Sequence, residues 1–246
     1  MIKRVAVLLS LVVFATVAFA NVGAPRGFAK KLYDATFALY LTQGKKSTFI
    51  CTATAFERAP GGYHLLSAGH CVEGVPTTMS FAVAEEIGGT LTPVNIVRAR
   101  DTEEVDFSSF YLQTTKHYPV IPLGNENESY VGDKTVDASF SMGLGKQIIT
   151  GQVVSEVLGN SNDCSDCAGR YLVQMLASSG SSGSAVVSLS SKRIIGVHVG
   201  DFRALESVAV EQISLYKKFL TLPDQQSEIR PDGTLLVPFQ LFPEAN

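Results

Sequence analysis

The sequence predicts an all-β protein organised in two β-rich halves. Its main part consists of short apolar runs, each about five to nine residues long and rich in Val, Ile, Phe, Tyr and Thr. Gly, Pro, Asn and Asp separate these runs, as they do in turns between antiparallel strands. None of the runs in the first half sustains a helical period over three turns. We therefore expect the first half to form a closed β-barrel.

Residues 1–20 are expected to be a secretory signal peptide and to lie outside the fold. Lys3 and Arg4 precede an uncharged apolar run at residues 5–19, and small residues at 18–20 offer a cleavage site. The run is short for a membrane span, and no positive charge closes its far end. An uncleaved anchor is the alternative. We expect an exported protein, secreted or periplasmic, without stable membrane association after signal cleavage.

Charge excludes some classes of partner. Of the 20 Lys and Arg residues, two lie in the signal segment, whereas none of the 23 Asp and Glu residues does, so the remaining chain has a net charge of −5. Such a balance argues against nucleic acid or an anionic membrane as a partner. The remaining length suits one large domain or two small ones.

The first half begins after a short arm. Residues 21–34 contain Gly23, Pro25 and Gly27, which predict an irregular N-terminal arm. The N-terminal barrel is placed at residues 35–118. Two prolines, a glycine and a polar run at 117–127 indicate a linker between the halves. The predicted strands of this barrel lie at residues 36–42, 49–56, 63–71, 78–87, 94–100 and 105–112.

The second half, at residues 119–222, has the same pattern of short apolar runs, but its last segment has a different periodicity. Apolar residues at 210–220 have helix-like spacing, which predicts one short C-terminal helix. Residues 223–246 are predicted to be a polar tail. The predicted strands lie at residues 131–141, 146–158, 170–176, 184–190, 193–200 and 207–210.

His70 is the first residue that suggests chemistry. It stands directly before Cys71, after a predicted strand that ends in small residues. An imidazole with an unperturbed pKa of about 6.5 can accept a proton and return it. A buried structural histidine is the alternative.

Asp106 opens the predicted strand at 105–112. Its carboxylate is expected at the end of that strand, where it could accept the second imidazole N–H and so fix the tautomer. Asp101, in a charged loop five residues earlier, is the competing acid. A surface aspartate without a catalytic role is the other alternative.

The Ser/Gly turn between two apolar strands is the third candidate. Gly180, Ser182 and Gly183 form a Gly-x-Ser-Gly unit. Glycine permits left-handed backbone and close approach of a substrate, and successive N–H groups in such a turn can bind a developing oxyanion. A solvated hairpin is the alternative.

In the order His, Asp, Ser, these segments resemble the chymotrypsin-like serine peptidases over roughly residues 36–220. The SAGHC, VDFSSF and GSSGSAVV segments are similar to the family's His, Asp and Ser boxes. The run from Ile121 to Ser155 is similar to the second barrel of HtrA-type and glutamyl-endopeptidase members. The resemblance implies two six-stranded antiparallel Greek-key barrels with the site in the cleft between them. About 26 residues follow the predicted helix, so no PDZ domain is expected.

The resemblance also implies a role for each residue. Ser182 would be the nucleophile, His70 the general base and then acid, and Asp106 the group that orients the imidazole. The backbone N–H groups of Gly180 and Ser182 would form the oxyanion hole. Ser181 replaces the aspartate that pairs with a new N-terminus in trypsin-like zymogens, so we expect a site formed without that ion pair.

The four cysteines are expected to form two disulfides in an exported chain. Cys51 and Cys71 match the disulfide that braces the family's histidine loop. Cys164 and Cys167 lie in a polar loop between strands, which is not the setting of a redox motif. We interpret them as a small disulfide near the cleft, with free thiols as the alternative.

Specificity is inferred from residues 196–200. This segment resembles the Gly-x-His-x-Gly segment of glutamyl endopeptidases, so His198 and Gly200 would contact the substrate residue before the scissile bond and favour Glu or Gln. A core histidine on a strand is the alternative for His198. Ala177 holds the place of a companion hydroxyl in those families, which Ser178 or Ser179 could supply instead.

The sequence therefore predicts a serine endopeptidase that acts on protein or peptide substrates and needs no cofactor and no metal. A catalytically silent relative that binds or scaffolds is the first alternative. An α/β-hydrolase esterase is the second, but its Gly-x-Ser-x-Gly elbow is absent because Ser184 occupies the last glycine's place.

Overall fold

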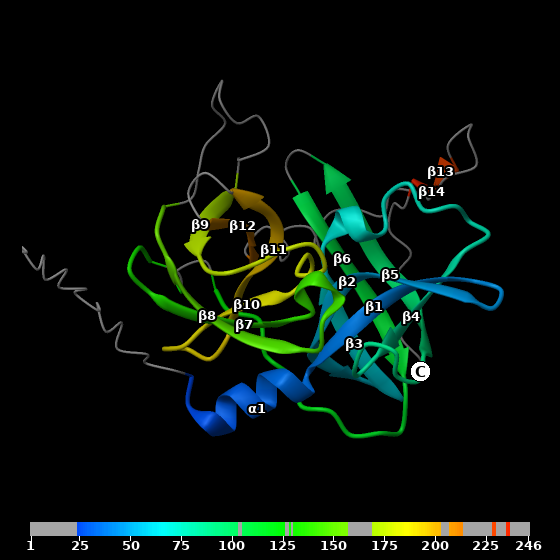
Figure 1. Ribbon diagram of the computed structural model, residues 1–246, viewed down its shortest axis with the longest axis horizontal. Helices are drawn as coiled ribbons and strands as arrows, with labels where there is room; N and C mark the ends of the chain where they lie inside the picture. Colours follow the sequence, from blue (N-terminus) through cyan, green and yellow to red (C-terminus); the bar gives the residue numbers. More distant parts are fainter. Residues whose placement is uncertain are drawn as a thin grey trace, which may run out of the picture.

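The computed structural model confirms the all-β class and the two six-stranded antiparallel barrels, which lie side by side in Figure 1. Each barrel closes on itself, so its strands leave no open edge for another chain to pair with. The residues that the structure describes are 24–102, 105–125, 128, 130–156, 169–202, 207–213, 228–229 and 235–236.

The first barrel uses every strand predicted for it, in the order β1-β2-β3-β6-β5-β4. Gly44 and Gly61, with φ of 59° and 75°, make the two tight turns that join its first three strands, where a side chain would be strained. The strands are β1 (Thr36–Gln43), β2 (Lys46–Ala59), β3 (Gly62–Ser67), β4 (Ser80–Ala84), β5 (Thr92–Thr102) and β6 (Val105–Gln113).

The second barrel has the equivalent order β10-β11-β12-β9-β8-β7. Outside both barrels, two short strands, β13 (Glu228–Ile229) and β14 (Leu235–Leu236), pair with each other. The barrel strands are β7 (Lys134–Ser139), β8 (Gln147–Val153), β9 (Arg170–Gln174), β10 (Ala185–Ser188), β11 (Ile194–Phe202) and β12 (Ser207–Gln212).

One apolar core runs from the first barrel into the second. Phe37, Leu65 and Phe107 are fully buried in the first barrel and belong to the same cluster as Val136 and Ile194 of the second. Burying such side chains contributes about 1.5–3 kcal/mol each. The shared cluster holds the two barrels in a fixed relation, which is what a site built from both of them requires.

The predicted irregular arm is wrong for residues 26–34, which form helix α1 (Arg26–Asp34). Phe28 and Leu32 stand four residues apart on one face of the helix and are buried against the core. The Lys146 ammonium donates a hydrogen bond of 2.8 Å to the Tyr33 carbonyl at the end of the helix. Tertiary packing thus overrides the local tendency of Gly27, whereas Pro25 stands just before the helix, where proline is tolerated.

The predicted C-terminal helix starts too early. Residues 207–212 are strand β12, paired with β9 and β11, so Val210 lies in a sheet. The remainder of that helix at 214–220 lies outside the described residues, as do the signal segment and the pair Cys164 and Cys167. Among the described helices, none has the length and apolar character that crossing a bilayer requires.

The Cys51–Cys71 disulfide is present and joins β2 to the segment after β3, across 20 residues of sequence. Changing both cysteines to alanine should lower the stability of the protein by about 3 kcal/mol, because the unfolded chain regains loop entropy. We expect the melting temperature to fall by roughly 10 °C in calorimetry. Reduced wild type should melt close to the double variant. Equal melting of oxidised wild type and variant would refute this.

Helix α1 should contribute to the same fold. Leu32→Ala should lower the free energy of unfolding by about 3 kcal/mol, because Leu32 is fully buried and its loss leaves a cavity. Lys31→Ala, on the exposed face of the helix, should change it by less than about 0.5 kcal/mol. Denaturant unfolding of both variants measures this, and similar values for the two would contradict the packing described.

Candidate active site

The turn that carries Ser182 lies between β9 and β10 and depends on two glycines. Gly180 and Gly183 have φ of 96° and 85°, in the region that favours glycine. A Cβ on Gly183 would stand 2.1 Å from Ser67 Oγ and 2.3 Å from the Thr52 carbonyl oxygen. No side chain fits in that space, so the turn can approach the first barrel only with glycine there.

Strand β2 of the first barrel holds this turn from the opposite side. The Thr52 N–H donates to the Ser182 carbonyl at 2.8 Å, and Thr52 Oγ1 donates to the Gly180 carbonyl at 2.8 Å. Thr52 is fully buried, so water does not compete for these bonds. One residue of the first barrel therefore fixes the backbone on both sides of the turn.

His70 lies in a single helical turn, η1 (Gly69–Cys71), which follows β3. Its backbone N–H donates to Asp106 Oδ1 at 2.9 Å, and its Nδ1 lies 2.8 Å from Asp106 Oδ2. The carboxylate only accepts, so Nδ1 carries the proton and Nε2 of the neutral ring is left as an acceptor. The disulfide at Cys71 anchors the same turn to β2.

Asp106 projects from the start of β6 and its side chain is only 5% exposed, whereas that of His70 is 34% exposed. A buried carboxylate with two short bonds to one histidine fixes both the position of the ring and its tautomer. Asp101 stands opposite Asp106 in the β5–β6 register, and its side chain is outside the described set. The structure thus brings Asp106 to His70.

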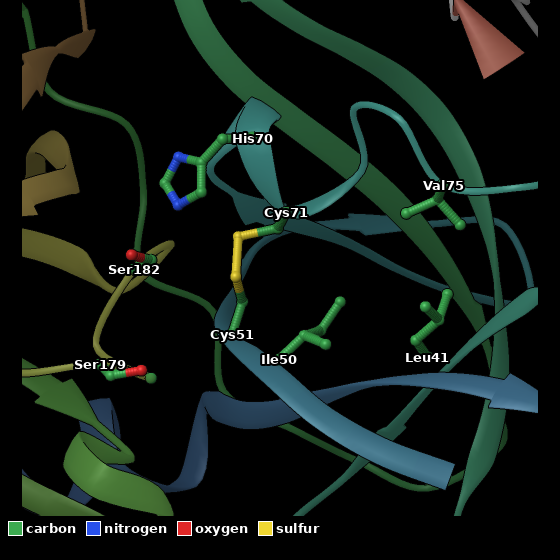
Figure 2. A pocket seen from close by; sticks show the side chains of 9 residues that line it. Leu41, Ile50, Cys51, His70, Cys71, Val75, Ser179 and Ser182 are labelled. Atoms are coloured by element: carbon green, nitrogen blue, oxygen red, sulfur yellow. A yellow bond between two sulfur atoms is a disulfide. The ribbon is translucent and has the colours of Figure 1, made fainter. Parts of the chain in front are cut away.

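His70 and Ser182 both line a pocket of about 400 Å³. Figure 2 shows the imidazole and the Ser182 hydroxyl on the same side of the Cys51–Cys71 disulfide. An ionisable base and a hydroxyl in one open pocket are the parts that acyl transfer needs. The pocket is lined by Leu41, Ile50, Cys51, His70, Cys71, Val75, Ser179, Gly180 and Ser182.

The peptide between Ser179 and Gly180 is oriented by a neighbouring turn, η3 (Ser141–Gly143). The Met142 N–H donates to the Ser179 carbonyl at 2.7 Å. Because the peptide is trans, the Gly180 N–H points in the opposite direction. No hydrogen bond among the described residues uses the N–H of Gly180 or of Ser182. Two backbone donors of the turn therefore have no acceptor among the described residues.

Ser181 stands at the position where trypsin-like zymogens have an aspartate, and it is fully buried. Its hydroxyl lies 2.5 Å from Ser141 Oγ and 3.4 Å from Ser139 Oγ. These bonds hold the turn from the side of the second barrel. The turn is therefore ordered without a charged group at position 181.

The residues expected to set specificity lie apart from the described pocket. His198 is 1% exposed, its Nε2 is 3.1 Å from the Gly200 carbonyl, and it does not line the pocket. Its backbone does reach the turn that carries Ser182, because its carbonyl accepts from the Gly183 N–H at 2.8 Å. Ala177 is partly buried and packs against the core of the second barrel.

Sequence reasoning missed three residues that shape the site. Met142 acts through its backbone N–H, which leaves no signature in a sequence. Thr52 acts through its N–H and its hydroxyl, and a threonine within an apolar strand gives no sign of such a role. Asp137 is a fully buried carboxylate on β7, 2.8 Å from Ser184 Oγ. An acid inside a run of otherwise apolar and small residues was the one signal that could have identified it.

Comparison with solved structures shows the fold. A serine endoprotease from Yersinia pestis aligns with a TM-score of 0.61 at 16% identity, over 81% of this chain and 66% of that one. The HtrA-type protease AlgW, solved with a tripeptide and with a decapeptide, aligns with a TM-score of 0.63 in both cases, at 18% and 16% identity. Those alignments cover 80% and 79% of this chain, but 62% and 66% of AlgW.

The family assignment comes from the sequence itself. No curated protein sequence matches the chain. A family model described as a trypsin-like peptidase domain matches residues 51–197, which is more than half of the chain and includes His70, Asp106 and Ser182. The chain therefore belongs to the family of trypsin-like peptidase domains and has the fold of a chymotrypsin-like serine peptidase.

Proposed function

We propose that the protein is an exported serine endopeptidase that hydrolyses peptide bonds through an acyl-enzyme on Ser182. The observation that carries the proposal is the pair of bonds from Asp106 to His70, in a pocket that His70 shares with Ser182. A structural histidine would not need an oriented ring that is 34% exposed in a pocket shared with a hydroxyl. Membership of the trypsin-like peptidase family supports the same reaction.

The reaction follows from the roles of these groups. Ser182 Oγ attacks the scissile carbonyl while His70 Nε2 takes its proton, and the imidazolium is stabilised by Asp106. The N–H groups of Gly180 and Ser182 stabilise the oxyanion of the tetrahedral intermediate. His70 then gives the proton to the leaving amine, and a water molecule activated by His70 releases the acyl group from Ser182.

The substrate class and the location rest on further observations. Two of the similar structures are an HtrA-type protease with a tripeptide and with a decapeptide, which supports peptides or proteins as substrates. The apolar run at residues 5–19 supports export. The Cys51–Cys71 disulfide fits an oxidising compartment, so we place the protein outside the cell or in a periplasm.

We further propose a preference for Glu or Gln before the scissile bond. The Gly196–Gly200 segment is similar to that of glutamyl endopeptidases, and the His198 backbone is bonded to the turn that carries Ser182. The imidazole lies 3.1 Å from the Gly200 carbonyl, and an N–H that turned from this carbonyl to the substrate would donate to a carboxylate or an amide oxygen.

Replacing the nucleophile tests the reaction. Ser182→Ala should lower kcat by at least about 10⁴-fold and abolish labelling by a fluorophosphonate, because the attacking oxygen is gone. Ser47→Ala, at an exposed serine that does not line the pocket, should keep both. Mass spectrometry of labelled protein gives the readout. Wild type that neither turns over peptides nor takes up the label would instead identify a catalytically silent relative.

Weakening the acid tests the role of Asp106 separately. Asp106→Asn should leave folding intact and lower kcat by about 10⁴-fold, because an amide can hold the wrong tautomer of His70. Steady-state kinetics at pH 7 measures this. A loss of less than tenfold would exclude Asp106 as the orienting group.

A peptide library tests the preference. Wild type should cleave after Glu or Gln, and His198→Val should lose that preference by about tenfold or more in kcat/KM, because no donor remains. Fluorophosphonate labelling of the variant serves as the control for an intact nucleophile. Strong cleavage by wild type after Arg, Lys or Phe would exclude the preference.

A further inference from the structure

The buried carboxylate of Asp137 is not used by the proposed reaction. It lies on β7 and is fully buried. Ser184 Oγ donates to its Oδ2 at 2.8 Å, and Ser139 Oγ lies 3.4 Å from its Oδ1. Taking a carboxylate out of water is costly unless it is fully hydrogen-bonded, so such a group is retained only where its bonds matter. Both of these bonds lead to the turn that carries Ser182.

The first route reaches the turn after the nucleophile. Ser184 is the second residue beyond Ser182 and is fully buried. Its N–H donates to the Ser181 carbonyl at 2.9 Å, and its own carbonyl accepts from the His198 N–H at 3.0 Å. Asp137 therefore fixes the Ser184 side chain, while hydrogen bonds to Ser181 and His198 fix the Ser184 backbone.

The second route reaches the turn before the nucleophile. Ser181 Oγ donates to Ser139 Oγ at 3.4 Å and lies 2.5 Å from Ser141 Oγ. An ionised carboxylate accepts only, so Ser139 must donate to it and then accept from Ser181, which in turn accepts from Ser141. Asp137 thus sets one direction along the whole chain of hydroxyls.

We propose that Asp137 is a positioning residue that holds the nucleophile turn in its catalytic shape through Ser184 on one side and through Ser139 and Ser181 on the other. It replaces the ion pair that position 181 cannot form. The inference deepens the proposed function and rests on it for its kinetic consequence. The polar cluster consists of Asp137, Ser139, Ser141, Ser181 and Ser184 and is called the Asp137 cluster.

Protonation gives the cluster a measurable signature. Burial raises the pKa of Asp137 to about 6, while the hydrogen bond from Ser184 and the neighbouring His198 act in the opposite direction. His198 of β11 is the titratable group that faces it. A protonated Asp137 would donate one proton, so the direction of the hydroxyl chain is lost. The single direction of the hydroxyl chain is therefore present above about pH 6 and is lost as the pH falls through that value.

Ionisation of Asp137 orders the hydroxyl chain but lowers the stability of the folded protein. The folded-state pKa is above the ordinary value of 3.8, so the folded protein binds the proton more tightly than the unfolded chain does. Ionisation of Asp137 consequently lowers stability as the pH rises from about 4 to 6. An Asp137→Asn variant should lack this decline and should be no less stable than wild type at pH 7. If Asp137 only supported the fold, Asp137→Asn would instead be less stable than wild type at pH 7.

The experiment compares Asp137→Asn with Thr135→Val, a buried position two residues away on the same strand whose hydroxyl is outside the cluster. An amide cannot accept from both serines as the carboxylate does. Asp137→Asn should lower kcat by about tenfold or more with KM within twofold. On the acid side, a plot of log kcat/KM against pH should approach a slope of two for wild type, in which both His70 and Asp137 must be deprotonated. It should approach a slope of one for Asp137→Asn, in which only His70 must be. Thr135→Val should match wild type in each respect.

A second readout does not depend on activity. Hydrogen exchange of the peptide that covers residues 178–185 should be about tenfold faster in Asp137→Asn than in Thr135→Val at pH 7, because the amides of Ser181, Gly183 and Ser184 are hydrogen-bonded in the turn. The inference would be overturned if Asp137→Asn changed neither hydrogen exchange nor kcat. It would also be overturned if the melting temperature of the variant fell so far that unfolding alone explained the loss of kcat. Wild type that exchanges as expected but takes up no fluorophosphonate would refute the proposed function alone.

Discussion

The close approach of Gly183 to strand β2 is the constraint on which the rest of the site depends. A Cβ at this position would overlap Ser67 Oγ and the Thr52 carbonyl. Because position 183 carries no side chain, the first barrel can reach the Ser182 turn and donate to it twice from Thr52. The site is therefore a property of the contact between two barrels, and neither barrel could hold the turn alone.

The protein buries many polar groups around that contact. Nearly all the polar groups that shape the Ser182 turn are hydrogen-bonded. Thr52, Ser67, Ser181 and Ser184 are fully buried hydroxyl residues with partners in the structure. Buried hydrogen bonds of this kind add little net stability, but they are costly to break. They therefore specify one conformation of the turn, while the apolar core supplies the stability that allows it.

The sequence was sufficient for the barrels and for the residues of the catalytic hypothesis. The strands of both barrels follow from short apolar runs between turn residues, which is a local signal. Helix α1 could not be predicted, because Phe28 and Leu32 are helical through packing on the core, against the local tendency of Gly27. The predicted strand at 207–210 is present as the start of β12, but its extension to Gln212 could not be predicted, since pairing with β9 and β11 outweighs the helix-like spacing of Val210 and its neighbours.

The supporting groups of the site were beyond sequence reasoning for a different reason. Thr52 and Asp137 act on residues about 130 and 47 positions away, and no spacing rule connects such partners. Only the folded chain shows that a threonine on β2 and an acid on β7 converge on one turn. The chemistry of a site can thus be read from its motifs, whereas its support depends on contacts made by the fold.

The position of the Cys51–Cys71 disulfide has a consequence for where the protein can work. Cys51 directly precedes Thr52, which holds the Ser182 turn, and Cys71 directly follows His70. A single covalent bond therefore links the strand that anchors the Ser182 turn to the segment that carries His70. Thiols that cleave this bond would remove the link, so under the proposed function the alignment of the two residues would depend on the redox state of the surroundings.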